Sequence, residues 1–272
     1  MKRRYWAMMM TGEKLTENEL FTLLEERADF YNRKAFIEPD PISIPHRFSR
    51  PADIEIAAFL TATIAWGQRR TIIKNANSLM ERMDNAPADF IRSFGPTDLK
   101  PFEQFVHRTF NGQDCLFFLR ALQHLINKYH SLENAFLPVQ AKRTEETLLY
   151  NNILLFRERF LGESAPVHVG KHISNPARGA AAKRLNMFLR WMVRKDKRGV
   201  DFGIWRQLNM SQLMIPLDVH SGRVARQLQL LQRKQDDWLA VVELTERLKQ
   251  FDPNDPVKYD FALFGMGVNA AS

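Results

Sequence analysis

The segment IPLDVHSGRVARQL, residues 215–228, places one aspartate between an apolar run and a basic stretch. Val224, Leu228 and Leu231 recur at helical spacing, which predicts a helix that begins just after Asp218. Aspartate is a preferred N-cap because its carboxylate accepts hydrogen bonds from the free N–H groups of a helix start. Asp218 is therefore predicted to cap this helix, and a second role for its carboxylate remains open.

Apolar residues recur at helical spacing in both directions from this segment, and clear period-2 strands are absent from the sequence. Two Pro-rich segments, 38–51 and 251–259, are predicted to be loops. The run 52–66 is apolar almost all round, so we expect a central core helix that ends where Gly67 can form a left-handed cap. The sequence thus predicts an all-α protein with further helices over 17–32, 115–129, 144–161, 181–195 and 237–251.

Composition indicates a globular protein, because 272 residues with 45% hydrophobic content can bury a sizeable core. The single cysteine, Cys115, excludes an internal disulfide and any cysteine-ligated cluster. The apolar run that follows the first basic residues is too short for a signal-peptide core, and no window approaches a membrane span. We therefore expect a cytoplasmic protein that does not enter membranes.

Positive charge is concentrated in one region. The net charge is +8, yet residues 171–235 alone hold fourteen Lys and Arg against three acids, an excess of +11, which leaves −3 for the rest. A basic surface on an otherwise slightly acidic protein favours a polyanion such as a nucleic acid as partner. A solvated basic face without a partner is the alternative.

A lysine upstream is a candidate partner for the aspartate. In SNPARGAAAKRLN, residues 174–186, Asn175 and Pro176 are typical of a capped helical start, and the small residues 179–182 allow close approach of a backbone or ligand. Lys183 then lies near the start of the predicted helix 181–195. The positive potential at a helix start suits phosphate and disfavours a protonated amine. Lys183 is therefore a candidate nucleophile.

These segments together resemble the helix-hairpin-helix DNA glycosylases, the superfamily of endonuclease III, MutY and the 8-oxoguanine glycosylases. IPLDVHSGRVARQL is similar to the pattern V-D-(T/V)-H-x-x-R-V-x-x-R-L, and GAAAKRLN is similar to the end of the hairpin, G-x-G-x-K-x-A-x. FLTATIAWGQRRTIIKNANSLM and YDFALFGMGV resemble the early helix pair and the last helix. The resemblance covers roughly 52–80 and 175–268, in the order of that family.

The sequence departs from the pattern at two points. Ala181 replaces the second glycine of the hairpin, and Lys183 and Asp218 are 35 positions apart. The long gap and the missing cluster cysteines are closest to the archaeal 8-oxoguanine DNA glycosylase branch. The basic insert KDKRGVDFGIW, residues 195–205, is expected to loop out, and whether Lys183 and Asp218 meet is left open.

The resemblance implies a two-lobed fold with an active-site cleft between the lobes. We expect residues 52–165 to form a helical lobe and 166–272 to form the hairpin and catalytic lobe with the C-terminal helix. Residues 1–51, a helix and a Pro-rich loop, are expected to pack on the second lobe. The whole chain would be one compact unit and a monomer.

The same resemblance implies a bifunctional DNA glycosylase and AP lyase that acts on an oxidised purine, such as 8-oxoguanine, in double-stranded DNA. Lys183 would attack the sugar and form a Schiff base, Asp218 would stabilise positive charge, and neither metal nor cofactor would be required. The implied base pocket consists of Gln68, Trp66, Asp260 and Phe264, and the implied DNA contacts are Gly179, Arg184, His220, Arg223, Arg226, Arg69 and Arg70.

Two alternatives remain open at this point. A non-catalytic nucleic-acid-binding module could have kept the glycosylase fold without turnover, which the imperfect hairpin favours and the joint presence of Lys183, Asp218 and Gln68 opposes. An RNA-processing helical protein could match the motifs by chance.

Overall fold

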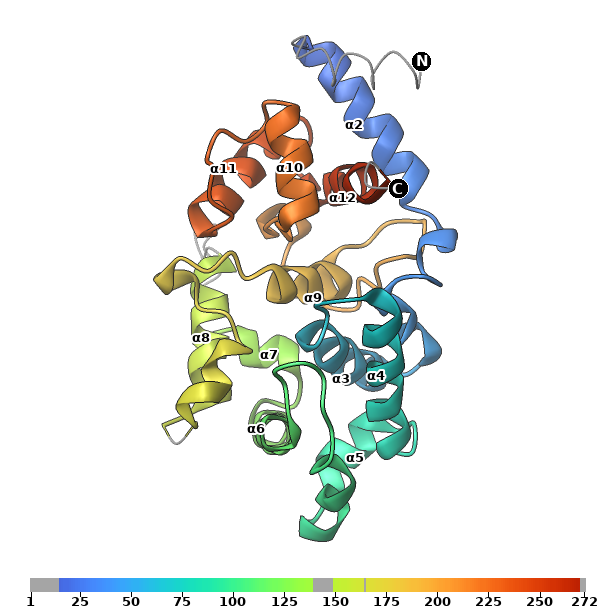
Figure 1. The fold of residues 1–272 in the computed structure, drawn as a ribbon, viewed down its shortest axis with the longest axis vertical. Helices are drawn as coiled ribbons and strands as arrows, with labels where there is room; N and C mark the ends of the chain where they lie inside the picture. The colour runs from blue at the N-terminus through green and yellow to red at the C-terminus, as the bar shows by residue number, and fades with distance from the viewer. Residues whose placement is uncertain (1–14, 139–148, 164, 270–272) are drawn as a thin grey trace. The chain divides into compact units, whose positions relative to one another are not determined.

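A computed structural model describes residues 15–138, 149–163 and 165–269. These residues form α-helices joined by short 3₁₀ turns (Figure 1). Within the described ranges there is no β-strand, and the only strand-like pairs are the isolated bridges His107–Phe110 and Ala180–Asp237. The prediction of an all-α protein is therefore confirmed.

The chain divides into two compact units. The first, here called the terminal unit, comprises the described residues of 15–36, 179–203 and 208–269, and the second, the central unit, comprises those of 37–178 and 204–207. The boundaries that the sequence suggested after residues 51 and 165 stay predictions. The unit boundary at Arg178–Gly179 assigns the predicted hairpin residues 179–183 to the terminal unit.

The terminal unit is organised around its last helix, α12 (Tyr259–Asn269), which lies between α2 (Glu17–Tyr31) and α10 (Val219–Gln227) (Figure 1). Two glycines of α12 permit this close packing. A Cβ atom on Gly265 would lie 2.3 Å from the Tyr31 ring, and one on Gly267 would lie 2.7 Å from the carbonyl oxygen of His220. The α12 backbone therefore approaches the end of α10 at which Asp218 is the N-cap. The unit is completed by α9 (Lys183–Val193) and α11 (Trp238–Lys249).

The central unit is built on α3 (Pro51–Thr63), which is buried along almost its whole length, as the sequence predicts. Its Phe59 ring packs against aromatic rings of two other helices, at centroid distances of 6.2 Å to Phe118 and 5.5 Å to Phe156. Around it lie α4 (Arg69–Arg82), α5 (Pro87–Ser93), α6 (Gly112–Tyr129), α7 (Leu132–Phe136) and α8 (Leu149–Leu161).

The buried carboxylate of Glu55 anchors Trp205, the last residue of the predicted insert 195–205. Its oxygens accept hydrogen bonds from the backbone N–H groups of Leu132 and Glu133, at the start of α7, and from the Trp205 indole at 2.7 Å. Burial raises the pKa of Glu55 despite these three donors. Asp201, also in the insert, is buried and accepts from Arg190 and Arg194. Residues 195–205 therefore form a loop that exposes Lys195, Lys197 and Arg198, as expected, while Asp201 and Trp205 anchor it in the interior.

Local predictions differ from the structure in several places. Helix α3 ends at Thr63, so Gly67 (φ +100°) lies in the following turn and does not cap it. Residues 38–51 contain the 3₁₀ turns η2 (Pro41–Ser43) and η3 (Pro45–Arg47), because Ile42 and Ile44 are drawn into the core. The predicted residues 144–148 lie outside the described ranges, and α5 and α7 are too short to show helical periodicity. The other 3₁₀ turns are η1 (Lys34–Phe36), η4 (Pro96–Phe102), η5 (Val167–Lys171), η6 (Pro176–Arg178), η7 (Met210–Gln212) and η8 (Pro256–Lys258).

No helix within the described ranges combines the length and the apolar character that crossing a membrane requires.

Candidate active site in the terminal unit

Asp218 is the N-cap of α10, as its sequence context predicts. Its Oδ1 atom accepts the backbone N–H groups of His220 and Ser221, each at 2.9 Å, and its own N–H donates to Ser221 Oγ at 2.9 Å. The helix ends at Gln227, so Leu231, predicted to continue its apolar face, is buried beyond the helix end. The capping bonds occupy Oδ1 and leave the other carboxylate oxygen, Oδ2, for a different partner.

That partner is Lys183, the first residue of α9. The Lys183 Nζ atom lies 3.2 Å from Asp218 Oδ2, and the two side chains are 32% and 13% exposed. The two side chains, whose contact the sequence left open, therefore meet although they are 35 positions apart in the chain. The structure brings the two predicted catalytic groups together at the starts of two helices.

The turn before Lys183 sets its direction. Gly179 (φ +83°) and Ala182 (φ +51°) both adopt the left-handed conformation, and Ala182 offers no side-chain cap to α9. The Gly179 carbonyl accepts from Trp238 N–H at 2.9 Å, and the Ala181 carbonyl accepts from Asn186 Nδ2 at 3.1 Å. These two hydrogen bonds fix the turn 179–182 and therefore the position of the Lys183 backbone, whose side chain reaches Asp218 at the start of α10.

The electrostatic environment keeps Asp218 ionised. Burial alone raises the pKa of a carboxyl group, but here the Lys183 ammonium, the Ser221 N–H group and the nearby His220 together lower the pKa of Asp218 below its ordinary value. Asp218 is therefore a fixed negative charge at neutral pH.

Asp260 is a second carboxylate near the pair. It lies on α12, is only 6% exposed, and forms an ion pair with the buried Arg190, which also contacts Asp201. Burial raises the pKa of Asp260 to about 6 against the attraction of Arg190, and the charges of Asp218 and Lys183 act on the group in opposite directions. The sequence offered no structural reason for this acid, and the structure supplies one, the ion pair with Arg190.

Phe264 is one turn further along α12 and is half-buried, so it is not a plain core residue. The Lys183 Nζ atom lies 5.9 Å from the centroid of its ring, and the His220 ring meets it edge-on at a centroid distance of 6.2 Å. The predicted residues Lys183, His220 and Phe264 are therefore neighbours in the terminal unit.

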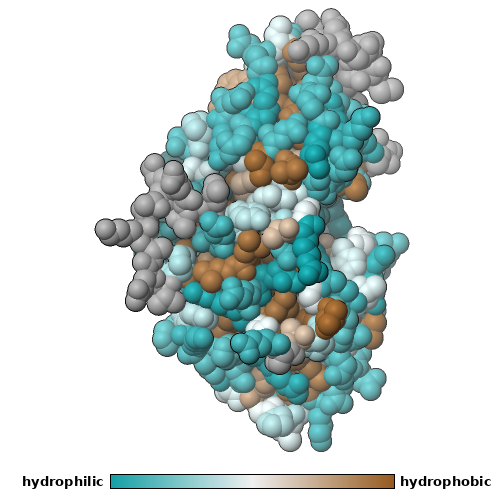
Figure 2. Space-filling view, turned by 90° about the vertical axis from the view of Figure 1, so that its left-hand side faces the viewer, coloured by the Kyte–Doolittle hydropathy of each residue, from teal (hydrophilic) through white to brown (hydrophobic). Residues whose placement is uncertain are grey.

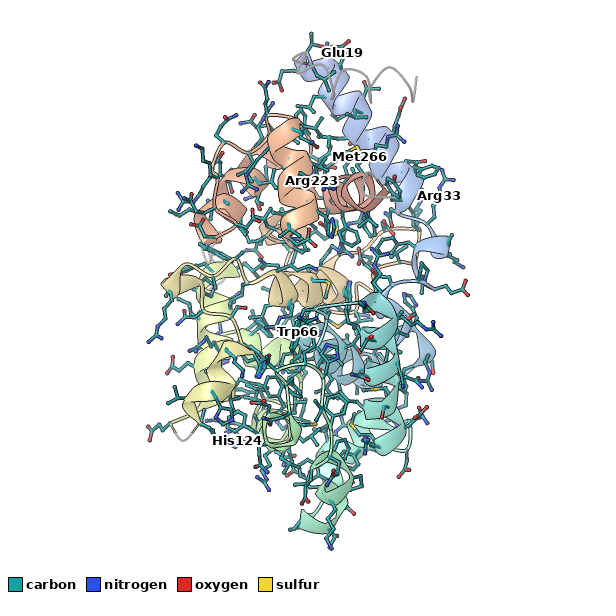
Figure 3. The ribbon with its side chains drawn as sticks, in the orientation of Figure 1. Glu19, Arg33, Trp66, His124, Arg223 and Met266 are labelled. Carbon is teal, nitrogen blue, oxygen red and sulfur yellow. The ribbon has the colours of Figure 1, made fainter. Side chains whose placement is uncertain are left out.

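The predicted DNA-contacting arginines of this unit differ in how strongly the protein itself holds them. Arg223 is exposed on α10, and its Nη2 donates to the Gly267 carbonyl of α12, the helix that also carries Met266 (Figure 3). Arg226 donates to the Arg233 carbonyl and to Asp236. Arg184 is half-buried, and burial lowers its pKa to about 10, so it is charged at neutral pH.

The basic excess of residues 171–235 is partly neutralised in the structure. Arg190 and Arg194 are buried in a network of ion pairs, where Arg194 contacts Asp196, Asp201 and Asp255. Three further pairs reach acids outside the basic segment: Arg198 with Asp29, Arg226 with Asp236, and Arg233 with Asp237. Counting charges along the sequence therefore overestimates the basic surface.

The other predicted site residues belong to the central unit. Gln68 is exposed and is the N-cap of α4 without a side-chain capping bond, and Arg69 and Arg70 begin that helix. Trp66 is half-buried, with its ring stacked on His172 at a centroid distance of 5.9 Å and edge-on to His107 at 4.9 Å.

Sequence reasoning did not anticipate the residues that hold Trp66. His107 Nε2 lies 3.1 Å from the Trp66 carbonyl oxygen, and His172 Nε2 lies 3.3 Å from a carboxylate oxygen of the fully buried Asp114. Isolated histidines in unpatterned segments give no sequence signal. An available clue was Asn111 followed three residues later by Asp114, which forms the capping box of α6.

Comparison with known proteins assigns a family without assigning an activity. The chain belongs to the family described as "Protein of unknown function (DUF2400)", which matches residues 40–269. No curated protein and no solved structure matches the chain.

Proposed function

We propose that this DUF2400 protein is a bifunctional DNA glycosylase and AP lyase that excises an oxidised purine, such as 8-oxoguanine, from double-stranded DNA. The observation that supports this most directly is the distance of 3.2 Å between Lys183 Nζ and Asp218 Oδ2. A primary amine beside an ionised carboxylate provides a nucleophile and a stabiliser for the positive charge that develops on a sugar during displacement.

The chemistry begins with a base extruded from the duplex, since a stacked base cannot be reached. Lys183 first releases a proton to solvent, which frees the lone pair on Nζ. Its nitrogen then bonds to C1′ while the bond from C1′ to the base breaks, and the base leaves with that electron pair and takes up a proton. Opening of the sugar ring at O4′ converts the amine into a Schiff base, and loss of a C2′ proton expels the 3′ phosphate, which cleaves the strand.

The two carboxylates have different roles in this proposal because their environments separate their pKa values. The pKa of Asp218 is lowered, so it serves as the constant negative charge facing C1′. The pKa of Asp260 is about 6, so it changes charge near neutral pH, and we assign it to polar recognition of the extruded base beside the Phe264 ring. Gln68 and Trp66 stay candidates for contacts with the base on the resemblance alone.

The proposed nucleic-acid contacts of the terminal unit are Gly179, Arg184, His220 and Arg223, and those of the central unit are Arg69 and Arg70. Arg226 has two donor atoms engaged within the protein, at distances of 2.7 and 2.8 Å, so we expect its contribution to affinity to be smaller than that of Arg223. Such contacts fix position and affinity on the DNA backbone and do not select a base.

Borohydride trapping tests this function. Wild-type protein is incubated with duplexes that contain 8-oxoguanine, an abasic site or no lesion, and the Schiff base is reduced to a stable adduct. Lys183→Gln should trap nothing, whereas Lys197→Gln, which removes the same charge from an exposed position of the same unit, should trap like the wild type. If the wild type binds duplex DNA but forms no adduct on any substrate, the non-catalytic binding module replaces the enzyme as the explanation.

A further inference from the structure

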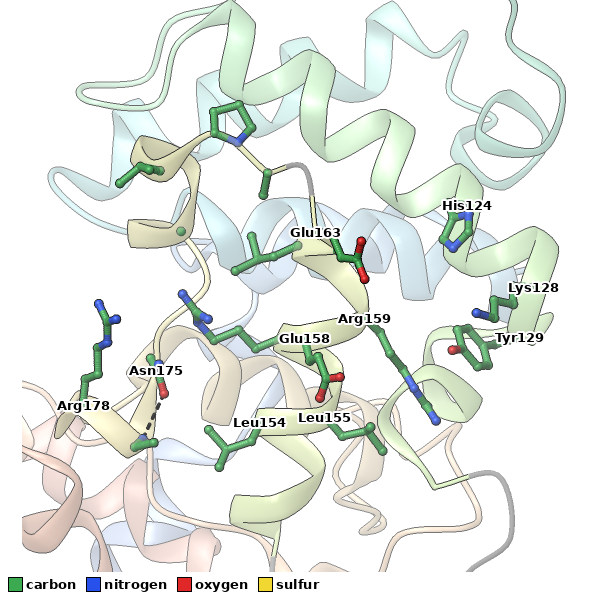
Figure 4. Close-up of a pocket in the computed structure, with 18 residues that line it drawn as sticks. His124, Lys128, Tyr129, Leu154, Leu155, Glu158, Arg159, Glu163, Asn175 and Arg178 are labelled. Carbon is green, nitrogen blue, oxygen red and sulfur yellow. Dashed lines mark hydrogen bonds between the residues drawn. The ribbon is translucent and has the colours of Figure 1, made fainter.

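The central unit contains a pocket whose lining includes none of the site residues predicted from the sequence. It has a volume of about 880 Å³ and is lined by the end of α6, by α8 and by residues 165–178 (Figure 4). Its charged side chains are Lys128, Arg157, Arg159 and Arg178 against Glu158 and Glu163. The face on the α8 side of the central unit mixes hydrophilic and hydrophobic side chains (Figure 2).

Two of the arginines have different relations to the pocket. Arg159 is engaged within the protein, because its Nη1 donates to the carbonyl oxygens of Ala135 and Leu137, at 2.9 and 2.7 Å, and its guanidinium stacks on Tyr129. Arg157 is anchored through Nε alone, which donates to the Ile173 carbonyl at 3.0 Å. The remaining donors of the Arg157 fork take no protein partner within the described ranges.

Gly170 leaves room for the guanidinium of Arg157 because it has no side chain. A Cβ atom on Gly170 would lie 3.2 Å from Arg157 Nη2, so a side chain at this position would crowd the group. Anchoring through Nε and seating against Gly170 hold the guanidinium in one orientation. A guanidinium fixed in this way presents two parallel N–H donors, the geometry that binds phosphate.

Arg178 supplies a second cation to the pocket lining. It is the last residue of η6, extends along the pocket wall (Figure 4), and is exposed. Asn175 Oδ1 accepts from Ala177 N–H at 3.0 Å and so fixes the turn that carries it. Burial lowers the pKa of Arg157, and so does repulsion by the Arg178 charge. An anion between them would relieve that repulsion.

We propose that Arg157 and Arg178 bind a phosphate group of a nucleic-acid strand in this pocket. The inference rests on the proposed function for the choice of a nucleic acid, whereas the phosphate chemistry rests on the two arginines. A pocket of about 880 Å³ is several times larger than one phosphate group, and a stretch of nucleic-acid backbone fits it better than a small ion does. Each such contact releases counterions and contributes about 0.9 to the slope of log affinity against log salt.

The test is duplex binding, measured by fluorescence anisotropy from about 0.05 to 0.3 M salt, with a labelled duplex that contains 8-oxoguanine. Arg178→Gln should reduce the salt slope by about one and weaken binding about five- to tenfold at 0.1 M salt. Arg178→Lys should retain the slope, because it keeps the charge. Lys100→Gln, at an exposed position of the same unit, is the matched control and should change neither quantity.

A second experiment distinguishes a phosphate of a nucleic acid from free inorganic phosphate. Binding of inorganic phosphate is measured by calorimetry on the wild type and on Arg178→Gln. If Arg178→Gln abolishes phosphate binding yet leaves duplex affinity and slope unchanged, the site takes a free phosphate and the nucleic-acid proposal is overturned. It is equally overturned if Arg178→Gln and Arg157→Lys both bind duplex like the wild type, or if the wild type binds no duplex. Borohydride trapping is scored separately, so loss of the Lys183 chemistry alone leaves this result intact.

Discussion

Replacing Asp218 with Asn separates the catalytic role of this residue from its role as a helix cap. Asn keeps an oxygen that can accept the two N–H groups now bound by Oδ1, at 2.9 Å each, and it is nearly as good an N-cap as Asp. It removes the negative charge that faces Lys183 Nζ at 3.2 Å. Capping is therefore retained while the ion pair is lost.

The expected loss of stability in Asp218→Asn is smaller than the expected loss of reaction rate, when both are expressed as free energies. The ion pair is partly open to solvent, with side chains 32% and 13% exposed, so its loss should lower the free energy of unfolding by about 0.5–1 kcal/mol. Loss of one electrostatic stabiliser at a reacting centre typically slows the reaction about 100-fold or more, equivalent to about 2.7 kcal/mol in the barrier. The effect on rate should thus exceed the effect on stability.

The assay pairs urea denaturation with single-turnover excision of 8-oxoguanine from a duplex. Asp218→Ala is the control for capping, because it also leaves the N–H groups of His220 and Ser221 without their acceptor and should cost about 1–2 kcal/mol more stability than Asn. An Asn variant that excises at more than a third of the wild-type rate would refute the catalytic assignment. So would a rate loss that only follows the fraction of unfolded protein.

Three further outcomes are expected. Lys183→Gln should abolish strand cleavage while leaving duplex affinity within about threefold in an anisotropy titration, since the Lys183 charge is paired with Asp218 and is not a proposed phosphate contact; a large affinity loss would indicate a binding role. Burial raises the pKa of Asp260 to about 6 from 3.8, so the folded state holds this proton more tightly, and the unfolding free energy should fall by at most about 3 kcal/mol as pH rises from about 4 to 6. Denaturation at a series of pH values should show that fall reduced in Asp260→Asn, and identical pH profiles would contradict the assignment. Gly267→Ala places a Cβ 2.7 Å from the His220 carbonyl oxygen and should lower the thermal unfolding midpoint, at a cost of about 1–3 kcal/mol; an unchanged midpoint would show that α10 and α12 can separate freely.

Long helices were predictable because burial imposes a period that the sequence displays. The helix at 181–195 is an example, since Leu185, Phe188, Leu189 and Met192 mark one face, and all four are buried in α9. Short elements were not predictable, because the five residues of α7 complete little more than one turn. Its start depends on Glu55, a carboxylate 77 residues away in the sequence, which no local pattern indicates.

The candidate site also contains residues that the sequence could predict and residues that it could not. Lys183 and Asp218 could be predicted because each lies at a helix start within a recognisable local pattern, and their contact at 3.2 Å was the part left open. The partner of Asp260 could not be predicted, since Arg190 lies 70 residues away and looked like one charge of a basic surface. Periodicity reports which face is buried, but it does not report which buried charges meet.

The most direct test of the account is to identify the lysine that carries the trapped sugar. Wild-type protein is reduced with borohydride on an 8-oxoguanine duplex, the adduct is digested with nuclease and protease, and the modified peptide is sequenced by mass spectrometry. The account predicts a single modified residue, Lys183, in the peptide that begins the helix α9. An adduct on another lysine or on the N-terminal amine, with Lys183 unmodified, would contradict it.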